Sequence, residues 1–248
     1  MITNTHLNNI PIQGRLSNQL HAIASLAGIA QRNSVEFSIP AWNYAKYFKN
    51  FNSSVSQYTT TDTTGFRKYI YEGMTYKDID LDPYQNYDLQ GYFQNEKYWI
   101  DNAEFIKHIF TPNFKVMSFF NDRVAIHVRH GDYLDRKGFH TCLTDSDYYE
   151  NALDQFPSST EYLVFSDDIE WCKTYFNHGR FTFVDPGMDY ADLFMMSQCS
   201  GFIIANSSFS WWGARLHELF AGECKVVAPS DWLVTWKEDV VPDRWLKV

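Results

Sequence analysis

The feature that most limits the fold is an alternation of short apolar segments and longer amphipathic segments between residues 123 and 228. The short segments are rich in β-branched residues, which is typical of buried strands, and the segments between them are typical of helices. The expected strands are 123–129, 162–165, 180–184, 201–205 and 225–228, and the expected helices are 145–156, 168–176, 190–199 and 209–220. Such alternation predicts βαβ units, that is, a parallel sheet covered by helices on both faces.

The first 120 residues are less regular. We expect strands at 9–13, 35–39 and 86–93, and helices at 17–32 and 96–110. The segment Asn50–Gly65 is rich in Ser, Thr and Asn and is typical of a loop or lid. The whole chain is therefore predicted to be α/β, with two Rossmann-like parallel-sheet domains at 1–120 and 121–248 and a cleft between them. Ligands of such sheets bind at the carboxyl ends of the strands.

Charge narrows the choice of ligand. Lys and Arg number 21 and Asp and Glu number 30, which gives a formal net charge of −9. This balance argues against general nucleic-acid binding, and an anionic ligand would have to be held by a few local positive groups. The sequence also shows no signal-peptide pattern, no apolar stretch of membrane-spanning length and no CxxC pair. We therefore expect a cytoplasmic protein without a transmembrane segment.

Acidic pairs raise the alternative of a metal site. No two glycines are spaced as a dinucleotide fingerprint requires, and no phosphate-loop motif occurs. The acidic residues of 78–82 and 145–147 could grip a divalent ion together with a diphosphate. The first group is more typical of a solvated turn, and the second is more typical of a helix N-terminus. We expect no metal at either.

The first loop that carries chemistry is Gly14–Gln19, between an expected strand and an expected helix. Gly14 lets the backbone approach a ligand, while Ser17 or Asn18 can cap a helix whose free amide groups attract anions. The alternative is an ordinary capped turn.

The second loop is His127–Tyr133. In a strand, His127 and Arg129 lie on one face, and His130 and Asp132 follow in the turn. A guanidinium group at this position suits bidentate contact with phosphate, and Asp132 could orient it or accept a proton. The alternative is a purely structural Arg–Asp pair at the edge of the sheet.

The third loop is Ile204–Gly213, where an apolar strand ends in Asn206, Ser207 and Ser208 before a helix begins. Hydroxyl groups and helix N-terminal amides together form an anion cradle. The alternative is N-capping by one of the serines.

Two carboxylates, Asp167 and Asp168, follow the strand 162–165 and are expected at the same sheet edge. A carboxylate that accepts two N–H bonds matches the edge of a guanine. For Asp168, the alternative is capping of the next helix.

Taken together, these segments resemble glycosyltransferase family 11, the α-1,2-fucosyltransferases that use GDP-fucose. The segments that carry the resemblance are Gly14–Leu20, Gly91–Tyr98, His127–Tyr133, Tyr148–Tyr149, Phe165–Asp168 and Ile204–Ala214. The chain departs from the family pattern at Ser17, where the family usually has Gly, and at His130, where it has a second Arg. Because His130 replaces a fixed charge, donor affinity is expected to depend on pH.

The resemblance implies a GT-B-like architecture and an inverting transfer that needs no metal or other cofactor. It implies that Arg129 holds the β-phosphate of GDP-fucose and that Ser207 and Ser208 bind the same diphosphate. His127 and Asp167 or Asp168 would face the nucleoside, and Asn18 with the Gly14 loop would close the cleft.

The expected catalytic residues are Arg129 and, as the base, Asp132 or His140, between which the sequence does not decide. The residues expected to bind substrate are Gly14, Arg15, Asn18, His127, His130, Asp167, Asp168, Asn206, Ser207, Ser208 and Phe209. The acceptor implied by the family is a galactose-containing glycan, fucosylated at the 2-hydroxyl of a terminal β-galactoside. A lipid-linked acceptor would bring the protein to a membrane surface. Two alternatives stay open: a metal-dependent sugar-nucleotide transferase with another donor, and a non-catalytic module that binds GDP or glycan.

Overall fold

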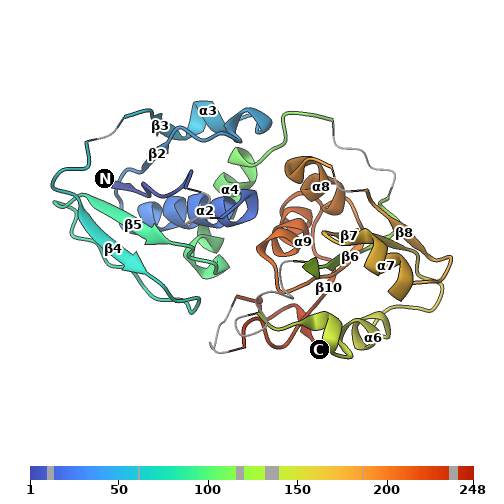
Figure 1. The fold of residues 1–248 in the computed structure, drawn as a ribbon. Helices are drawn as coiled ribbons and strands as arrows, with labels where there is room; N and C mark the ends of the chain where they lie inside the picture. The colour runs from blue at the N-terminus through green and yellow to red at the C-terminus, as the bar shows by residue number, and fades with distance from the viewer. Residues whose placement is uncertain (10–13, 61, 116–119, 132–139, 186, 235–239) are drawn as a thin grey trace. The chain divides into compact units, whose positions relative to one another are not determined.

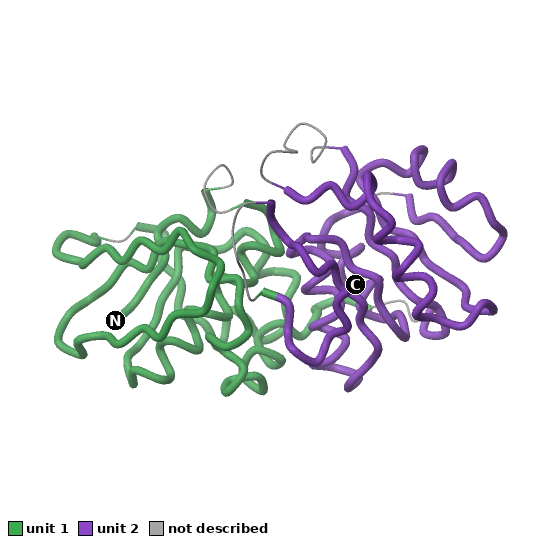
Figure 2. The backbone as a smooth tube through the Cα atoms, turned by 90° about the horizontal axis from the view of Figure 1, so that it is seen from below, with its two compact units in different colours: residues 1–115, 237–240 green, residues 116–236, 241–248 purple. Residues whose placement is uncertain are grey.

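The structure is a computed structural model that describes residues 1–9, 14–60, 62–115, 120–131, 140–185, 187–234 and 240–248. The chain divides into two compact units, which Figure 2 shows in different colours. Unit 1 comprises residues 1–115 and 237–240, and unit 2 comprises residues 116–236 and 241–248. Each unit has its own parallel sheet and is described by itself.

Unit 2 is built on a six-stranded sheet with the order β11-β10-β9-β6-β7-β8 (Figure 1). Every strand pair in it is parallel. The strands are β6 Val124–Val128, β7 Tyr162–Ser166, β8 Phe181–Phe183, β9 Gly201–Ile203, β10 Lys225–Ala228 and β11 Leu246–Lys247. From the other edge the order is β8-β7-β6-β9-β10-β11, so the strands of unit 2, numbered along the chain, lie in the order 3-2-1-4-5-6. This is the doubly wound order of dinucleotide-binding sheets. The direction of winding reverses between β6 and β9.

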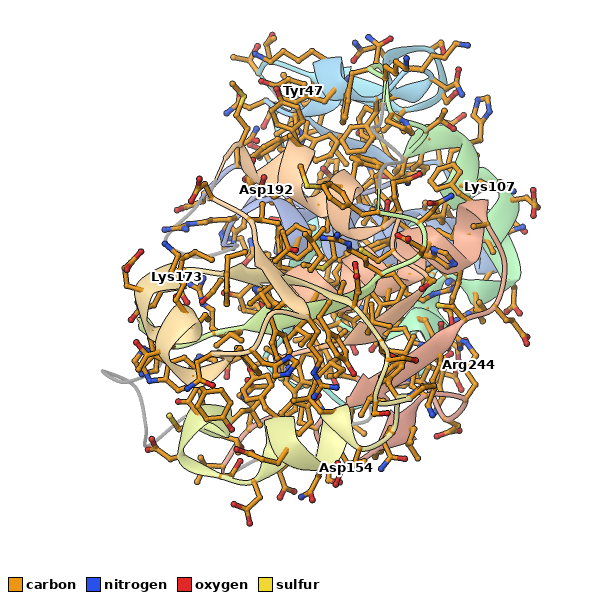
Figure 3. All side chains as sticks on the ribbon, turned by 90° about the vertical axis from the view of Figure 1, so that its right-hand side faces the viewer. Tyr47, Lys107, Asp154, Lys173, Asp192 and Arg244 are labelled. Atoms are coloured by element: carbon orange, nitrogen blue, oxygen red, sulfur yellow. The ribbon has the colours of Figure 1, made fainter. Side chains whose placement is uncertain are left out.

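Helices cover both faces of this sheet (Figure 1). The helices are α6 Tyr148–Leu153, α7 Ile169–Tyr175, α8 Asp189–Met196 and α9 Ser208–Phe220, with a short 3-10 turn at Leu143–Asp145. Residues of α6 and α7 share a buried cluster with Val124, Ile126 and Val128, which alternate along β6 and so lie on one face. The other face of β6 carries His127, which contacts α9. Charged side chains such as Lys173 and Arg244 lie on the outside of the unit (Figure 3).

Unit 1 contains a three-stranded parallel sheet, in the order β1-β5-β4, and a parallel pair of β2 and β3. A parallel bridge from Ile2 to Phe37 joins the two. The strands are β1 Ile2–Thr3, β2 Ser38–Pro40, β3 Ser56–Tyr58, β4 Arg67–Tyr71 and β5 Tyr87–Gly91, and the helices are α2 Leu16–Arg32, α3 Phe51–Ser54 and α4 Ala103–Ile109. Three 3-10 turns lie at Ala45–Tyr47, Glu96–Tyr98 and Ile100–Asn102.

Helix α2 forms the centre of unit 1, because nearly all of its residues are buried. A neighbouring segment approaches it so closely at Gly28 that a Cβ there would lie 2.0 Å from the Tyr98 carbonyl oxygen. Beside α2, Trp42 packs among Phe48, Phe51 and Phe110, and its indole N–H donates to Gln19 Oε1 at 2.8 Å. The apolar area buried here holds the unit together.

The α/β class with parallel sheets is confirmed, and in unit 2 each expected strand and helix is present with small shifts of its ends. Two expectations for unit 1 were wrong in detail. The expected loop at Asn50–Gly65 contains α3 and β3, because β3 gains hydrogen bonds by pairing with β2. The expected helix at 96–110 is broken into two 3-10 turns followed by α4, because the buried Trp99 has a non-helical φ of −141°. The first strand is β1, while residues 10–13 of the expected strand lie outside the described residues.

Within the described part of the chain, we find no helix with both the length and the apolar character needed to span a bilayer.

Candidate active site

The carboxyl ends of β6 and β9 mark the centre of the candidate site. These strands pair in parallel, with Ile126 opposite Ile203, so the residues that follow both strands emerge at the same edge of the sheet. Arg129 and His130 follow β6, and the segment 204–207 leads from β9 to the start of α9. Since the winding reverses between these two strands, a crevice for a ligand is expected at this point.

Arg129 forms an ion pair with a carboxylate from the neighbouring strand β7. Its guanidinium Nη1 lies 3.3 Å from Asp167 Oδ2, and each side chain is 23% exposed. The other oxygen, Asp167 Oδ1, accepts from the backbone N–H of His130 at 3.0 Å. Gly131 gives the carboxylate room, because a Cβ there would lie 3.2 Å from Asp167 Oδ2. The carboxylate thus fixes the guanidinium, which remains partly open to solvent.

His130 and Asp168 form a second pair beside the first. His130 Nδ1 lies 2.9 Å from Asp168 Oδ2, and the imidazole stacks on Trp171 with 4.7 Å between ring centroids. Asp168 Oδ1 accepts from the Trp171 backbone N–H at 3.0 Å, so Asp168 caps α7. That backbone bond, followed by the bond to His130, lowers the pKa of the Asp168 carboxyl. The capping interpretation of Asp168 is correct, and the same carboxylate also holds His130.

His127 connects β6 to α9. Its imidazole is buried, with Nδ1 2.9 Å from the Ser210 hydroxyl and the ring 5.4 Å from that of Phe209. Burial, and then the nearby charge of Arg129, lower the pKa of His127 to about 3. At neutral pH the imidazole is therefore uncharged. In this structure it contacts the first turn of α9.

The start of α9 contains the predicted hydroxyl groups. Ser207 is the N-cap, and its Oγ accepts from the Phe209 backbone N–H at 3.3 Å. Ser208 is the first helical residue. Asn206 is buried, and its Nδ2 donates to the carbonyls of Thr141 and Trp232, both at 2.9 Å. The N-terminal amide groups of this long helix attract negative charge to the edge at which Arg129 lies.

Of the two candidates for the general base, His140 lies in the part of the chain that the structure describes. Asp132 lies outside the described residues. His140 forms an antiparallel bridge with Leu233, next to Thr141 and Trp232, whose carbonyls bind Asn206. This segment is therefore attached to the loop between β9 and α9.

The remaining predicted residues belong to unit 1. Gly14 adopts a positive φ of 75°, which favours glycine, and Arg15 precedes the first turn of α2. The Gln19 side chain donates to the Gly14 carbonyl at 2.9 Å, and Gln94 Nε2 donates to Asn18 Oδ1 at 2.7 Å. Gly14, Arg15 and Asn18 lie together at the N-terminal end of α2, where a Cβ on Gly14 would lie 2.4 Å from Asn18 Nδ2.

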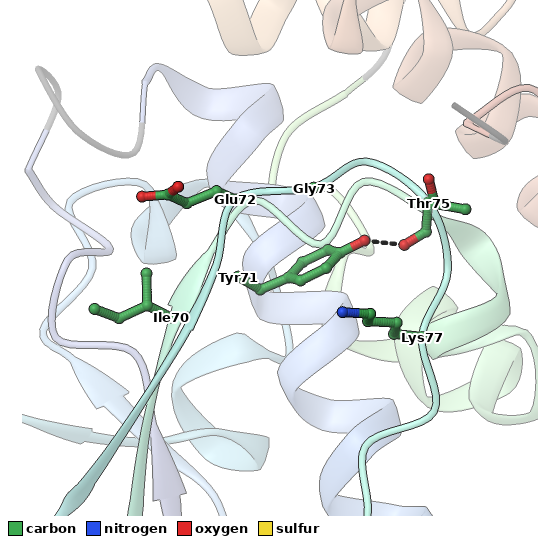
Figure 4. Close-up of a pocket in the computed structure, with 6 residues that line it drawn as sticks. All are labelled: Ile70, Tyr71, Glu72, Gly73, Thr75 and Lys77. Carbon is green, nitrogen blue, oxygen red and sulfur yellow. Dashed lines mark hydrogen bonds between the residues drawn. The ribbon is translucent and has the colours of Figure 1, made fainter. Parts of the chain in front are cut away.

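An open hollow of about 580 Å³ lies beyond the end of β4 in unit 1 (Figure 4). It is lined by Ile70, Tyr71, Glu72, Gly73, Thr75 and Lys77. The Tyr71 hydroxyl donates to the Thr75 carbonyl (Figure 4). The Tyr71 ring stacks on that of Phe93, with 5.5 Å between centroids. Lys77 Nζ lies 5.8 Å from the centre of the Tyr71 ring. The hollow was not predicted from the sequence, because β4 itself was not predicted.

Sequence reasoning also missed the partners Ser210, Trp171 and Gln94. Ser210 follows the predicted Ser207 by one helical turn, which is the signal that would have placed it at the α9 terminus. Among the described residues, no group of three or more His, Cys, Asp or Glu side chains is arranged to hold a metal ion.

Comparisons with known proteins add the following. A family model described as "Glycosyl transferase family 11" matches residues 2–233. An alpha-1,2-colitosyltransferase of Escherichia coli is 32% identical over 64% of this chain and 61% of that protein. The O-antigen biosynthesis glycosyltransferase WbnK of Escherichia coli is 30% identical over 73% of this chain and 68% of that protein. A galactoside 2-alpha-L-fucosyltransferase of Mus musculus is 25% identical over 84% of this chain and 63% of that protein. The matches thus span about two thirds of these relatives.

Solved structures show the same fold. POFUT1 in complex with GDP-fucose superposes with a TM-score of 0.53 at 12% identity and covers 92% of this chain and 96% of that chain. A mutant of Arabidopsis thaliana FUT1 in complex with GDP has a TM-score of 0.53 at 12% identity, over 98% of this chain and 72% of that chain. Likeness at such identity concerns the fold alone, and it confirms the predicted GT-B-like class.

Proposed function

We propose a reaction for this chain from the premise that it belongs to glycosyltransferase family 11. The chain transfers L-fucose from GDP-β-L-fucose to a hydroxyl group of a galactose-containing glycan, with inversion at the anomeric carbon. Unit 2 binds the donor and unit 1 lies on the acceptor side. One observation supports the donor site most: Arg129, the Asp167–Asp168 pair and the start of α9 follow three adjacent parallel strands where the winding reverses.

The chemical step has a simple charge balance. An acceptor oxygen attacks the anomeric carbon, the bond from that carbon to the β-phosphate oxygen breaks, and the electron pair leaves with GDP. Negative charge therefore grows on the β-phosphate, where fixed N–H donors stabilise the transition state as an oxyanion hole does. We assign this role to Arg129, with Ser207, Ser208 and the α9 amide groups as further donors to the diphosphate. No divalent ion is required in this proposal.

Asp167 and His127 have supporting roles in the proposal. Asp167 holds the Arg129 guanidinium in place and leaves part of it open to solvent, where phosphate oxygens can reach it. His127, uncharged and bonded to Ser210, keeps the first turn of α9 next to β6. Because Asp167 is paired with Arg129, we assign recognition of the guanine base of the donor to Asp168, which His130 holds at the same edge of the sheet.

The proton of the acceptor hydroxyl needs a base, and Asp132 and His140 remain the two candidates. The pH–rate profiles of Asp132→Asn and His140→Gln decide between them. The variant that loses the acidic limb of the profile identifies the base, and a profile unchanged in both variants discards both.

A panel of nucleotide sugars tests the proposal as a whole. The protein is incubated with GDP-fucose, GDP-colitose and representative UDP- and CMP-sugars, with and without simple β-galactosides, and nucleotide release is measured. We expect release of GDP from GDP-fucose only when acceptor is present, and activity that survives EDTA. The colitosyl donor is the second candidate, because a colitosyltransferase is 32% identical to this chain.

Two outcomes would favour the alternatives. Activity lost with EDTA and restored by Mn²⁺ would favour a metal-dependent transferase, and a GDP-induced thermal shift without any release would favour a binding module. A cytoplasmic location is part of the proposal and is supported by four cysteines that form no disulfide. Peripheral contact with a membrane would follow from a lipid-linked acceptor.

A further inference from the structure

Two consecutive tyrosines of α6, Tyr148 and Tyr149, are buried in the core of unit 2 yet each directs its hydroxyl group at a strand-end carbonyl. The Tyr148 hydroxyl donates to the Ile204 carbonyl at 2.5 Å, and the Val227 carbonyl lies 3.2 Å from the same oxygen. The Tyr149 hydroxyl donates to the His127 carbonyl at 3.1 Å. One short helix therefore contacts β6, β10 and the residue that follows β9.

These hydroxyl groups are protonated donors at neutral pH. Burial raises the pKa of both Tyr148 and Tyr149 well above the ordinary value. A buried carbonyl oxygen that loses a hydrogen-bond donor is destabilised, so each of these bonds helps to hold its strand end in place. The two rings also pack edge to face, with centroids 5.0 Å apart, which fixes the hydroxyl positions relative to each other.

The carbonyls in question lie directly before the candidate site. His127 is two residues before Arg129, and Ile204 is two residues before Asn206 and three before the N-cap Ser207. The His127 residue is held twice, by Tyr149 of α6 at its carbonyl and by Ser210 of α9 at its imidazole. Thus α6 holds the two segments that carry the guanidinium and the start of α9.

We propose that Tyr148 and Tyr149 are positioning residues, which set the spacing between Arg129 and the N-terminus of α9. The inference rests on the proposed function, because that spacing must fit a diphosphate whose charge grows as GDP leaves. In this role neither tyrosine touches the substrate. They act through the backbone of His127 and Ile204, so they affect the fit of the transition state more than the binding of the acceptor.

The test uses Tyr148→Phe and Tyr149→Phe, which keep the packed ring and remove only the hydroxyl group. Tyr162→Phe is the matched control, because Tyr162 is an equally buried tyrosine of the same core cluster but lies at the first residue of β7, at the opposite end of the strands. Melting temperature, kcat, and KM for donor and acceptor are measured for each variant well below its melting temperature. We expect kcat to fall about tenfold or more in Tyr148→Phe and Tyr149→Phe, since small misplacements are costly in rate.

The control and the KM values separate positioning from stability. We expect acceptor KM to stay unchanged in both variants, and Tyr162→Phe to keep its kcat. Wild-type kcat in both variants overturns the proposal, as does an equal loss in Tyr162→Phe. If the wild type transfers sugar from none of the donors, the proposed function has failed. The positioning role is then judged by GDP affinity from calorimetry, which must weaken in Tyr148→Phe and Tyr149→Phe and not in Tyr162→Phe.

Discussion

Replacing Arg129 by alanine tests the charge-stabilising role most directly, because the structure offers a closely matched control on the same strand. Arg129 follows the carboxyl end of β6, and Arg123 precedes its amino end. Both guanidinium groups are 23% exposed and both pair with a carboxylate, Asp167 at 3.3 Å for Arg129 and Glu161 at 3.1 Å for Arg123. The two substitutions therefore remove the same group, with the same exposure and a carboxylate partner, from opposite ends of one strand.

The expected magnitudes separate stability from activity. An ion pair in which both partners are partly exposed contributes up to about 1 kcal/mol, so neither substitution should unfold the protein. The loss of one fixed donor to a developing oxyanion costs about 3 kcal/mol, which lowers kcat by about 100-fold or more. Arg129→Lys should also lose most turnover, because an ammonium group lacks the planar fork of the guanidinium.

The assay follows GDP release from GDP-fucose in the presence of a β-galactoside, with unfolding in urea measured alongside. We expect kcat to collapse in Arg129→Ala and to stay near wild type in Arg123→Ala, while the free energies of unfolding remain similar. A near-native kcat in Arg129→Ala would refute the reasoning. So would an equal loss in Arg123→Ala, since the effect would then come from the strand and not from the site.

Three further outcomes are expected from the geometry. The pKa of His127 is lowered to about 3 in the folded chain, so below about pH 6.5 the unfolded chain takes up a proton that the folded chain does not, and stability is lost on acidification. In His127→Gln, about 2 kcal/mol of the stability lost between pH 7 and pH 5 should no longer be lost, as measured by urea unfolding. Gly28→Ala should lower the free energy of unfolding by about 2–3 kcal/mol, because the new Cβ would lie 2.0 Å from a backbone carbonyl oxygen. Gly179→Ala should lower it little, because nothing lies within 4 Å of a Cβ there, and an equal loss in both variants would contradict the packing argument. If the hollow beyond β4 holds the acceptor, Tyr71→Ala should raise acceptor KM about tenfold and leave donor KM unchanged. Tyr84 is 98% exposed, so the control Tyr84→Ala should change neither KM.

The second half of the chain was predictable because its periodicity and its topology agree. Continuous apolar strands such as 124–128 and 162–166 are buried on both faces, so their sequence signal is strong, and parallel pairing then forces the ends of β6, β7 and β9 to one edge. That step brought Arg129, Asp167 and Ser207 together from sequence alone. It needed no knowledge of side-chain conformation.

Unit 1 was harder to predict because its elements depend on tertiary contacts. Strand β4 lies at the edge of its sheet and none of its residues is fully buried, with Arg67, Lys68 and Ile70 exposed, so it lacks the apolar run of a buried strand. Strand β3 is short and polar and exists through its pairing with β2. Propensity is weak in such segments, and neighbours decide the conformation.

Side-chain partners were the least predictable part of the site, and they change how it should work. Sequence placed Arg129 and Asp167 at the same edge, but only the structure shows that the guanidinium is already paired. In a chain with a net charge of −9, this pairing has two consequences: the arginine is held in one place before the donor arrives, and a diphosphate must compete with a carboxylate for it. Affinity for GDP therefore depends on how much stronger the contact between Arg129 and the diphosphate is than the contact between Arg129 and Asp167. By this reasoning Asp167→Asn tightens GDP binding while it loosens the guanidinium, so that kcat and the dissociation constant for GDP fall together.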